Sequence, residues 1–266
     1  MITKTSGGHR LATAIRAANE QGHAALIAFL TGGYPDRERF IANLAAITQE
    51  ADIVEIGVPF SDPVADGPTI QNSSRTALAG GVSLSWILQQ TAARDWDAPL
   101  VIMSYLNPIL AMGFASFAER AAASHIDGVI IPDLPLEECA PLQEALAARD
   151  IALIQLVTPV TPDSRLAPVC EQSDGFVYAV TSTGVTGGNA GASLAQIGQG
   201  LDRIRAVTRL PVCTGFGLRS ADDVAALSRH ADGVIVGSAL IEAIGDGRDA
   251  AGFLRDLRPR NSKIPA

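Results

Sequence analysis

Short apolar runs rich in β-branched residues recur along the chain, and each is followed by a polar segment with a helical pattern. Near-continuous apolar strands are typical of a parallel sheet that is covered on both faces. Their alternation with helices predicts repeated βα units. The eight runs are AALIAFL (24–30), ADIVEIG (51–57), PLVIMSY (99–105), IDGVIIP (126–132), IALIQLV (151–157), DGFVYAV (174–180), LPVCTG (210–215) and ADGVIVG (231–237).

Eight βα units predict an α/β fold, a (β/α)₈ TIM barrel, with an extra N-terminal helix over residues 9–20. The alternative is an open, doubly wound sheet. Such a sheet usually has a GxGxxG fingerprint after its first strand, whereas TGGYP (31–35) follows the first run here. No linker or low-complexity segment divides the chain, so we expect residues 1–266 to form a single domain.

Helix start signals follow several of the runs. Asp36 and Ser83 are expected N-caps, and Pro162 with Asp163 opens the segment after the fifth run. The segment SADD (220–223) has the spacing of a capping box in which aspartate replaces glutamate.

Composition excludes several classes of function. The net charge of −8 argues against a surface for nucleic acid or an anionic membrane, and no apolar run approaches the roughly 20 residues of a membrane span. Three widely spaced cysteines predict reduced thiols in a cytoplasmic protein. None of the four histidines is paired at metal-ligand spacing, so no metal site is expected.

Lysine is almost absent. Only Lys4 and Lys263 occur, both near the chain ends, whereas Schiff-base and pyridoxal phosphate (PLP) enzymes need a lysine inside the site. No GK[ST] occurs either, which excludes a Walker A phosphate loop. The chemistry must come from other groups.

The stretch VEIGVPFSDPVADGPTIQ (54–71) places carboxylates near a strand end with no basic residue before Arg75. Active sites of such barrels lie at the C-terminal ends of the strands. Glu55 is expected to be buried, which raises a carboxyl pKa, unless a distant arginine neutralises it. Asp66 lies beyond a loop stiffened by proline, and on its own it is equally typical of an Asp-Gly turn. Two carboxylates at the same end of the barrel can act as a general acid and a general base.

Glycines follow each of the last three runs, in STGVTGGNAG (182–191), GFG (215–217) and GS (237–238). Barrels often hold a phosphate after strands seven and eight, at a helix N-terminus. The glycines therefore predict a phosphate site, although tight turns alone would also explain them. Core packing is the ordinary role of Tyr178 in the sixth run. It is also the ordinary role of three residues near strand ends that would otherwise form an apolar pocket wall: Phe29, Met103 and Phe216.

These motifs resemble the α subunit of tryptophan synthase over about residues 9–255, in LIAFLTGGYPD, VEIGVPFSDPVADGPTIQ, SYLNPI, DGVIIPDLPLEE, STGVTGG, GFGLRS and DGVIVGSALI. The resemblance implies a lyase that cleaves indole-3-glycerol phosphate by a retro-aldol reaction, giving indole and glyceraldehyde 3-phosphate for tryptophan biosynthesis. It also implies a β-subunit partner in an α₂β₂ heterotetramer. PLP is expected in that partner, and no cofactor in this chain.

Site residues carried over by motif follow from the same resemblance. Catalytic roles fall on Glu55, Asp66 and Tyr178, and phosphate binding on Gly187, Gly217, Gly237 and Ser238. The indole pocket and loop closure involve Phe29, Met103, Phe216 and Thr186. Asp62 and Asn107 are expected to face the β subunit.

Three other functions stay open on the sequence. The chain could be a stand-alone indole-glycerol-phosphate lyase, which shares every site residue. It could be a catalytically silent scaffold subunit, against which the intact Glu55 and Asp66 argue. A different phosphate-binding barrel, such as a sugar-phosphate isomerase, is the fourth reading.

Overall fold

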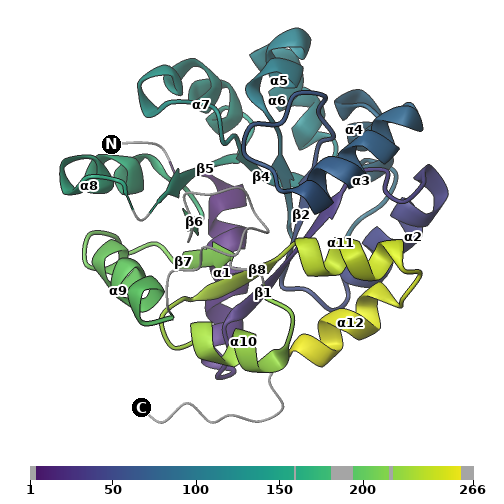
Figure 1. Cartoon of the computed structure of the whole chain (residues 1–266). Helices are drawn as coiled ribbons and strands as arrows, with labels where there is room; N and C mark the ends of the chain where they lie inside the picture. The colour runs from purple at the N-terminus through teal and green to yellow at the C-terminus, as the bar shows by residue number, and fades with distance from the viewer. Residues whose placement is uncertain (1–3, 159, 181–193, 216–217, 259–266) are drawn as a thin grey trace.

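The computed structural model describes residues 4–158, 160–180, 194–215 and 218–258. Parallel strands close into a barrel in the order β1 to β8, and helices surround it (Figure 1). The predicted (β/α)₈ fold is therefore confirmed. The strands are β1 (Ala25–Thr31), β2 (Ile53–Gly57), β3 (Leu100–Met103), β4 (Ile126–Ile130), β5 (Ala152–Val157), β6 (Val177–Val180), β7 (Val212–Gly215) and β8 (Gly233–Val236).

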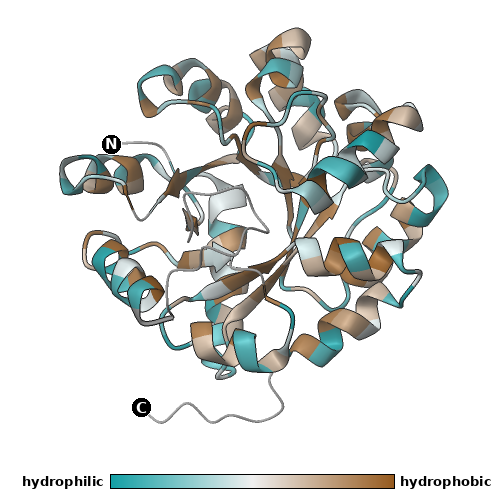
Figure 2. Cartoon of the chain, viewed as in Figure 1, coloured by the Kyte–Doolittle hydropathy of each residue, from teal (hydrophilic) through white to brown (hydrophobic). Residues whose placement is uncertain are grey.

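Seven strands lie within the apolar runs that predicted them, and β1 extends one residue beyond its run, to Thr31. Both faces of the strands are covered, as the unbroken burial of β1 and β2 illustrates. Figure 2 shows the apolar strands at the centre and polar residues on the outward faces of the surrounding helices. The pairing of β1 with β8, from Ala25 opposite Gly233 to Ala28 opposite Val236, closes the barrel.

The helices follow the strands in the chain order that the fold requires. They are α1 (Ser6–Glu20), α2 (Arg37–Ile47), α3 (Pro68–Ala79), α4 (Leu84–Thr91), α5 (Leu106–Met112), α6 (Phe114–Ala122), the 3₁₀ helix η1 (Leu136–Glu138), α7 (Ala140–Ala147), α8 (Asp163–Gln172), α9 (Leu194–Arg205), α10 (Ala221–Leu227), α11 (Ser238–Gly245) and α12 (Ala250–Leu257).

The expected helix caps are confirmed. The Asp36 carboxylate accepts the N–H groups of Glu38 and Arg39 at the start of α2. The Ser83 hydroxyl accepts the N–H of Trp86 at the start of α4. Ser220 and Asp223 form the predicted capping box of α10, in which the shorter aspartate still reaches the backbone N–H of Ser220 at 3.0 Å.

The N-terminal helix α1 lies across the amino-terminal end of the barrel, against β1, β2, β4 and β5. It begins at Ser6, earlier than the predicted residue 9, because the Thr5 hydroxyl caps it by accepting the Gly8 N–H at 2.9 Å. Leu11 is fully buried in the barrel floor. A Cβ on Gly128 of β4 would lie 2.8 Å from the Leu11 Cδ1, so the glycine leaves room for the Leu11 side chain.

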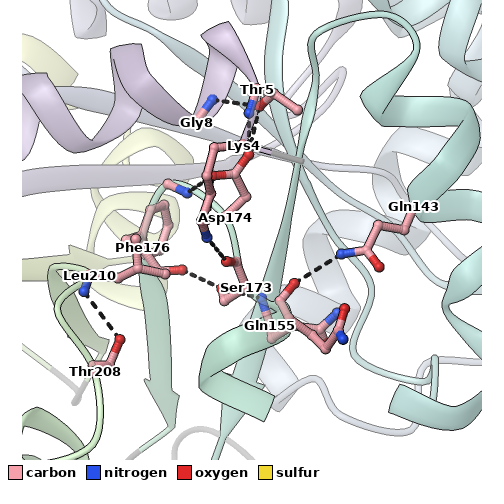
Figure 3. Close-up of polar contacts among 12 residues, drawn as sticks. Lys4, Thr5, Gly8, Gln143, Gln155, Ser173, Asp174, Phe176, Thr208 and Leu210 are labelled. Carbon is pink, nitrogen blue, oxygen red and sulfur yellow. Dashed lines mark hydrogen bonds and ion pairs between the residues drawn. The ribbon is translucent and has the colours of Figure 1, made fainter. Parts of the chain in front are cut away.

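Asp174 fixes α1 to the barrel, as Figure 3 shows. Its carboxylate accepts both the backbone N–H and the hydroxyl of Thr5, each at 2.8 Å. The Lys4 ammonium donates to the Ser173 carbonyl at 2.6 Å and lies 3.7 Å from the Asp174 carboxylate. One buried carboxylate thus satisfies the cap residue of the helix.

A recurring polar contact joins the strands in pairs at this same end. In three of the pairs, a side chain at or just before the start of the even-numbered strand accepts a backbone N–H at the start of the preceding odd-numbered strand. In the pair of β5 and β6, the acceptor is Ser173, four residues before β6, and the donor is Gln155 within β5. This contact satisfies a donor that the sheet would otherwise leave unpaired. The pairs are Leu26 to Asp52 (2.7 Å), Leu100 to Asp127 (3.0 Å), Gln155 to Ser173 (2.9 Å) and Val212 to Asp232 (2.8 Å).

Candidate active site

Glu55 is an isolated carboxyl group inside the barrel. It lies on β2 two residues before Gly57, so both residues share the strand face toward which the Phe29 ring points. The side chain is 1% exposed, and neither carboxyl oxygen has a hydrogen-bond partner among the described residues. Burial raises the pKa of Glu55 to about 8, and the nearby Asp66 carboxylate adds to the rise.

Asp66 lies in the loop between β2 and α3 and is half-buried. It lines a pocket together with Gly57, which is two residues after Glu55 on β2. Desolvation raises the pKa of Asp66 itself, and a hydrogen bond from the Tyr105 hydroxyl opposes that rise. The two predicted carboxylates are therefore brought together, Glu55 inside the barrel and Asp66 in the loop that follows its strand.

Tyr178 joins this pair from β6. Burial is the main cause that raises its pKa, with contributions from the charges of Glu55 and Asp66. A Cβ built on Gly215 of β7 would lie 3.2 Å from the Tyr178 hydroxyl, so a larger residue there would press on that oxygen. The fold thus gathers all three residues that were predicted to be catalytic.

A pocket opens beside these groups at the C-terminal ends of the first three strands. Its lining residues include Phe29 and Met103, which were predicted to form an indole pocket, and also Asp66. The remaining lining residues are Thr31, Gly57, Val58, Ile70, Ser74, Ser104, Tyr105 and Pro132. Its wall is mostly apolar, with one carboxylate, which suits a flat aromatic ring bearing an N–H.

Two of the predicted phosphate ligands are described. Gly237 is the N-cap residue and Ser238 the first residue of α11, so the helix N-terminus and a hydroxyl lie at the C-terminal end of β8. A Cβ on Gly237 would lie 3.5 Å from the Phe29 Cδ1, which places this helix start beside the pocket wall. Gly187 and Gly217, like the predicted pocket residues Thr186 and Phe216, lie outside the described residues.

The two residues predicted to face a partner are both exposed, on loops that follow neighbouring strands. Asp62 accepts a hydrogen bond from the Ser61 hydroxyl at 2.5 Å, and Asn107 lies in the first turn of α5. Close by in sequence, Val64 is 79% exposed and Leu110 is 50% exposed.

Tyr105 is a site residue that the sequence reasoning missed. It is the N-cap residue of α5 and lines the pocket together with Asp66. It lies in the motif SYLNPI, but a single tyrosine at a strand end is most often a core residue. The available signal was its place at the C-terminal end of β3, next to the strand that carries Glu55.

Within the residues that the structure describes, no three His, Cys, Asp or Glu side chains are grouped so that they could hold a metal ion. None of the described helices is long and apolar enough to cross a membrane. The chemical groups at the site are therefore carboxyl, hydroxyl and backbone N–H groups beside an apolar pocket.

A sequence profile of the tryptophan synthase alpha chain matches residues 15–259. The chain belongs to the tryptophan synthase alpha chain family. A tryptophan synthase alpha chain of Deinococcus radiodurans is 42% identical over 254 residues, 94% of each chain. Another, from Gluconacetobacter diazotrophicus, is 46% identical over 247 residues, which cover 91% of this chain and 90% of that relative.

Solved structures give the same result. A crystal structure of tryptophan synthase from M. tuberculosis in an aminoacrylate-bound form superposes with a TM-score of 0.85 at 34% identity. The match covers 94% of this chain and 98% of that one. A tryptophan synthase alpha subunit from Legionella pneumophila superposes with a TM-score of 0.85 at 28% identity. Tryptophan synthase alpha chains are lyases of tryptophan biosynthesis, and this chain has the α-subunit role.

Proposed function

We propose that this tryptophan synthase alpha chain cleaves indole-3-glycerol phosphate into indole and glyceraldehyde 3-phosphate, with Glu55 as the proton shuttle. The observation that carries this proposal is the buried Glu55 carboxyl, which has no hydrogen-bond partner among the described residues and lies near Asp66. With a pKa of about 8, Glu55 is mostly protonated at neutral pH, so it is ready to act as an acid.

Cleavage of the carbon–carbon bond needs an acceptor for its electrons. Protonation of indole C3 by Glu55 turns the ring into that acceptor, because the indolenine form can take up the electron pair. The Glu55 carboxylate then removes the proton from the hydroxyl on the adjoining glycerol carbon. The bond from C3 to that carbon breaks, the carbonyl forms, and the aromatic ring is restored. Glu55 ends the cycle protonated, so atoms and charges balance without a cofactor.

Asp66 supports this step from the pocket wall. Its carboxylate accepts the indole N1 proton or holds it in a hydrogen bond as positive charge develops on the ring. The half-buried position strengthens that interaction relative to water. Tyr178, which lies near both carboxyl groups, would contact the reacting end of the substrate.

The ring and the phosphate would bind at opposite ends of the same opening. Phe29 and Met103 would pack against the indole ring in the apolar pocket. Ser238, at the N-terminus of α11, offers a hydroxyl and backbone N–H groups to the phosphate, which need no lysine. Gly187, Gly217 and Gly237 are proposed to complete the cradle, and Thr186 and Phe216 the closed pocket.

The partner would be a β subunit, in an α₂β₂ heterotetramer that carries PLP only in the β subunits. We expect it to dock where β2 and β3 end, on the exposed residues of the segments that follow these strands: Asp62, Val64, Asn107 and Leu110. We expect the isolated chain to release indole slowly and the complex to release it much faster.

The test measures indole release from indole-3-glycerol phosphate by the purified chain, alone and with a β subunit. Slow release that rises with the partner supports the α-subunit role. Glu55→Gln should lower kcat by roughly 10²–10⁴-fold with or without the partner. Glu20→Gln, at the exposed end of α1, is the matched control and should leave the rate unchanged. Fast release without a partner would indicate a stand-alone lyase, and no release in either condition would refute the proposal.

A further inference from the structure

The Glu242 carboxylate links two segments that lie far apart in the sequence. Glu242 lies on α11, and its Oε1 accepts a hydrogen bond from the Thr69 hydroxyl at 3.1 Å. The Arg219 guanidinium donates to the same oxygen at 3.3 Å and lies 3.1 Å from Oε2. Thr69 belongs to the first turn of α3, and Arg219 comes just before the N-cap of α10. One side chain therefore joins the segments that follow β2, β7 and β8.

The position of Glu242 on α11 directs it toward the proposed phosphate site. Glu242 lies four residues after Ser238, so the two side chains share one face of the helix. Long side chains of a helix point back toward its N-terminus, which is the end that carries Ser238. A negative charge one turn away from a phosphate would oppose phosphate binding. The paired Arg219 guanidinium offsets that charge.

The contact with Thr69 reaches Asp66 through the first turn of α3. The N-cap residue of this helix, Gly67, makes no side-chain hydrogen bond to it. The side-chain amide of Gln71 donates to the backbone carbonyl of Asp66 at 2.9 Å. Because Thr69 and Gln71 belong to the same turn, a shift of that turn also moves Asp66 and the pocket residue Ile70.

We propose that Glu242 is a positioning residue, which holds the first turn of α3 through Thr69 and thereby fixes Asp66. Arg219 balances the charge of Glu242 beside the phosphate. This inference rests on the proposed function, because it needs the indole ring at Asp66 and the phosphate at Ser238. The ion pair is largely in water, with 67% of the Arg219 side chain exposed, so it adds little to stability. Its effect should therefore appear in the kinetic constants rather than in the melting temperature.

Thr69→Val tests the contact with α3, because it removes the hydroxyl and keeps the shape of the side chain. For indole release by the chain with a β subunit, we expect kcat to fall roughly tenfold, since a misplaced catalytic group loses rate, and KM to change little. Thr69→Ser keeps the donor and should restore kcat. Thr76→Val, at an exposed position later in α3, is the matched control and should leave both constants unchanged. A wild-type kcat in Thr69→Val would overturn the proposal.

Two further variants test the balance of charge. Arg219→Gln leaves the Glu242 charge unopposed, so KM should rise roughly 3- to 10-fold at low salt and by less at high ionic strength. Glu242→Gln keeps an acceptor for Thr69 and removes the charge, so kcat should stay near the wild-type value and KM should fall. Arg229→Gln removes the same charge at an exposed position after α10 and should leave KM unchanged. A KM that rises in Glu242→Gln would contradict the charge balance.

Hydrogen–deuterium exchange gives a readout that does not depend on turnover. Exchange in the first turn of α3 should be faster in Thr69→Val and in Glu242→Ala than in the wild type and in Thr69→Ser. The melting temperature of each variant should change little. Unchanged exchange in Glu242→Ala would overturn the proposal. If the wild type releases no indole while the variants exchange faster, the proposed function fails and the link from Glu242 to α3 stands.

Discussion

Burial raises the pKa of Glu55, and the carboxylate of Asp66, in the loop that follows the Glu55 strand, adds to the rise. Burial also raises the pKa of Asp66, but less than that of Glu55. The two groups therefore ionise in order, Asp66 first and Glu55 near pH 8. Between those two steps the site holds one carboxylate and one carboxylic acid, the combination that the proposed reaction uses.

The first prediction is a bell-shaped pH profile of kcat/KM for indole release. Activity should rise as Asp66 ionises, at a pH above the usual range for aspartate because its pKa is raised. Activity should fall again near pH 8 as Glu55 loses the proton that it donates to C3. Initial rates from pH 4.5 to 9.5 in the complex would measure both limbs. A rate that keeps rising above pH 9 would contradict the role of Glu55 as an acid.

The second prediction concerns stability, since an ionised Glu55 would be buried without a partner. A raised folded-state pKa means that the penalty is absent below the unfolded value of 4.5 and grows as pH rises to about 8. At about 1.4 kcal/mol per unit, the full effect is roughly 5 kcal/mol. Glu55→Gln cannot ionise, so its melting temperature should exceed that of the wild type by more at pH 9 than at pH 5. Equal differences at both pH values would argue against a buried, unpartnered carboxyl.

The third prediction is that Gly57→Ala damages the indole pocket. A Cβ at this position would lie 2.5 Å from the Phe29 Cζ, so the ring must move into the pocket. Overpacking of this kind typically costs about 1–3 kcal/mol. We expect KM for the substrate to rise about tenfold or more, measured by steady-state kinetics. Gly200→Ala, which faces open space on α9, is the control and should keep the wild-type KM.

The fourth prediction separates the barrel floor from the chemistry. Asp174→Ala removes the acceptor of the Thr5 N–H and hydroxyl, and each unpaired buried polar group costs about 1–3 kcal/mol. The melting temperature should fall by several degrees, whereas kcat of the folded enzyme should change little. Asp97→Ala, at an exposed position before β3, is the control. A large loss of kcat at a temperature where the variant is folded would show that α1 also shapes the active site.

The barrel was predictable from sequence because its strands are buried on both faces and their apolar runs are unbroken. The apolar pattern does not mark where a strand ends, because the run PLVIMSY continues beyond β3, which ends at Met103. That difference hid Tyr105, which appeared to be a strand residue and instead begins α5. Helix α1 was placed correctly, but its start depends on Asp174, a residue far away in sequence that no local pattern connects to Thr5.

The residues of the candidate site could be proposed from the sequence, and their roles stay predictions, but their contacts could not be foreseen. Glu55 and Asp66 could be chosen because carboxylates are rare in an apolar strand and its adjoining loop. The absence of a described partner for Glu55 could not be read from the chain, because an arginine elsewhere might have reached it. The roles of Gly187, Gly217, Thr186 and Phe216 stay predictions, as does a single domain over residues 1–266.

Helix α1 has a kinetic consequence that follows from its place in the barrel. With Leu11 buried in the floor, the amino-terminal end is no route for small molecules. The substrate must then enter, and indole and the triose phosphate must leave, through the same opening between the strand ends. A subunit covering that opening would therefore decide whether indole meets water at all.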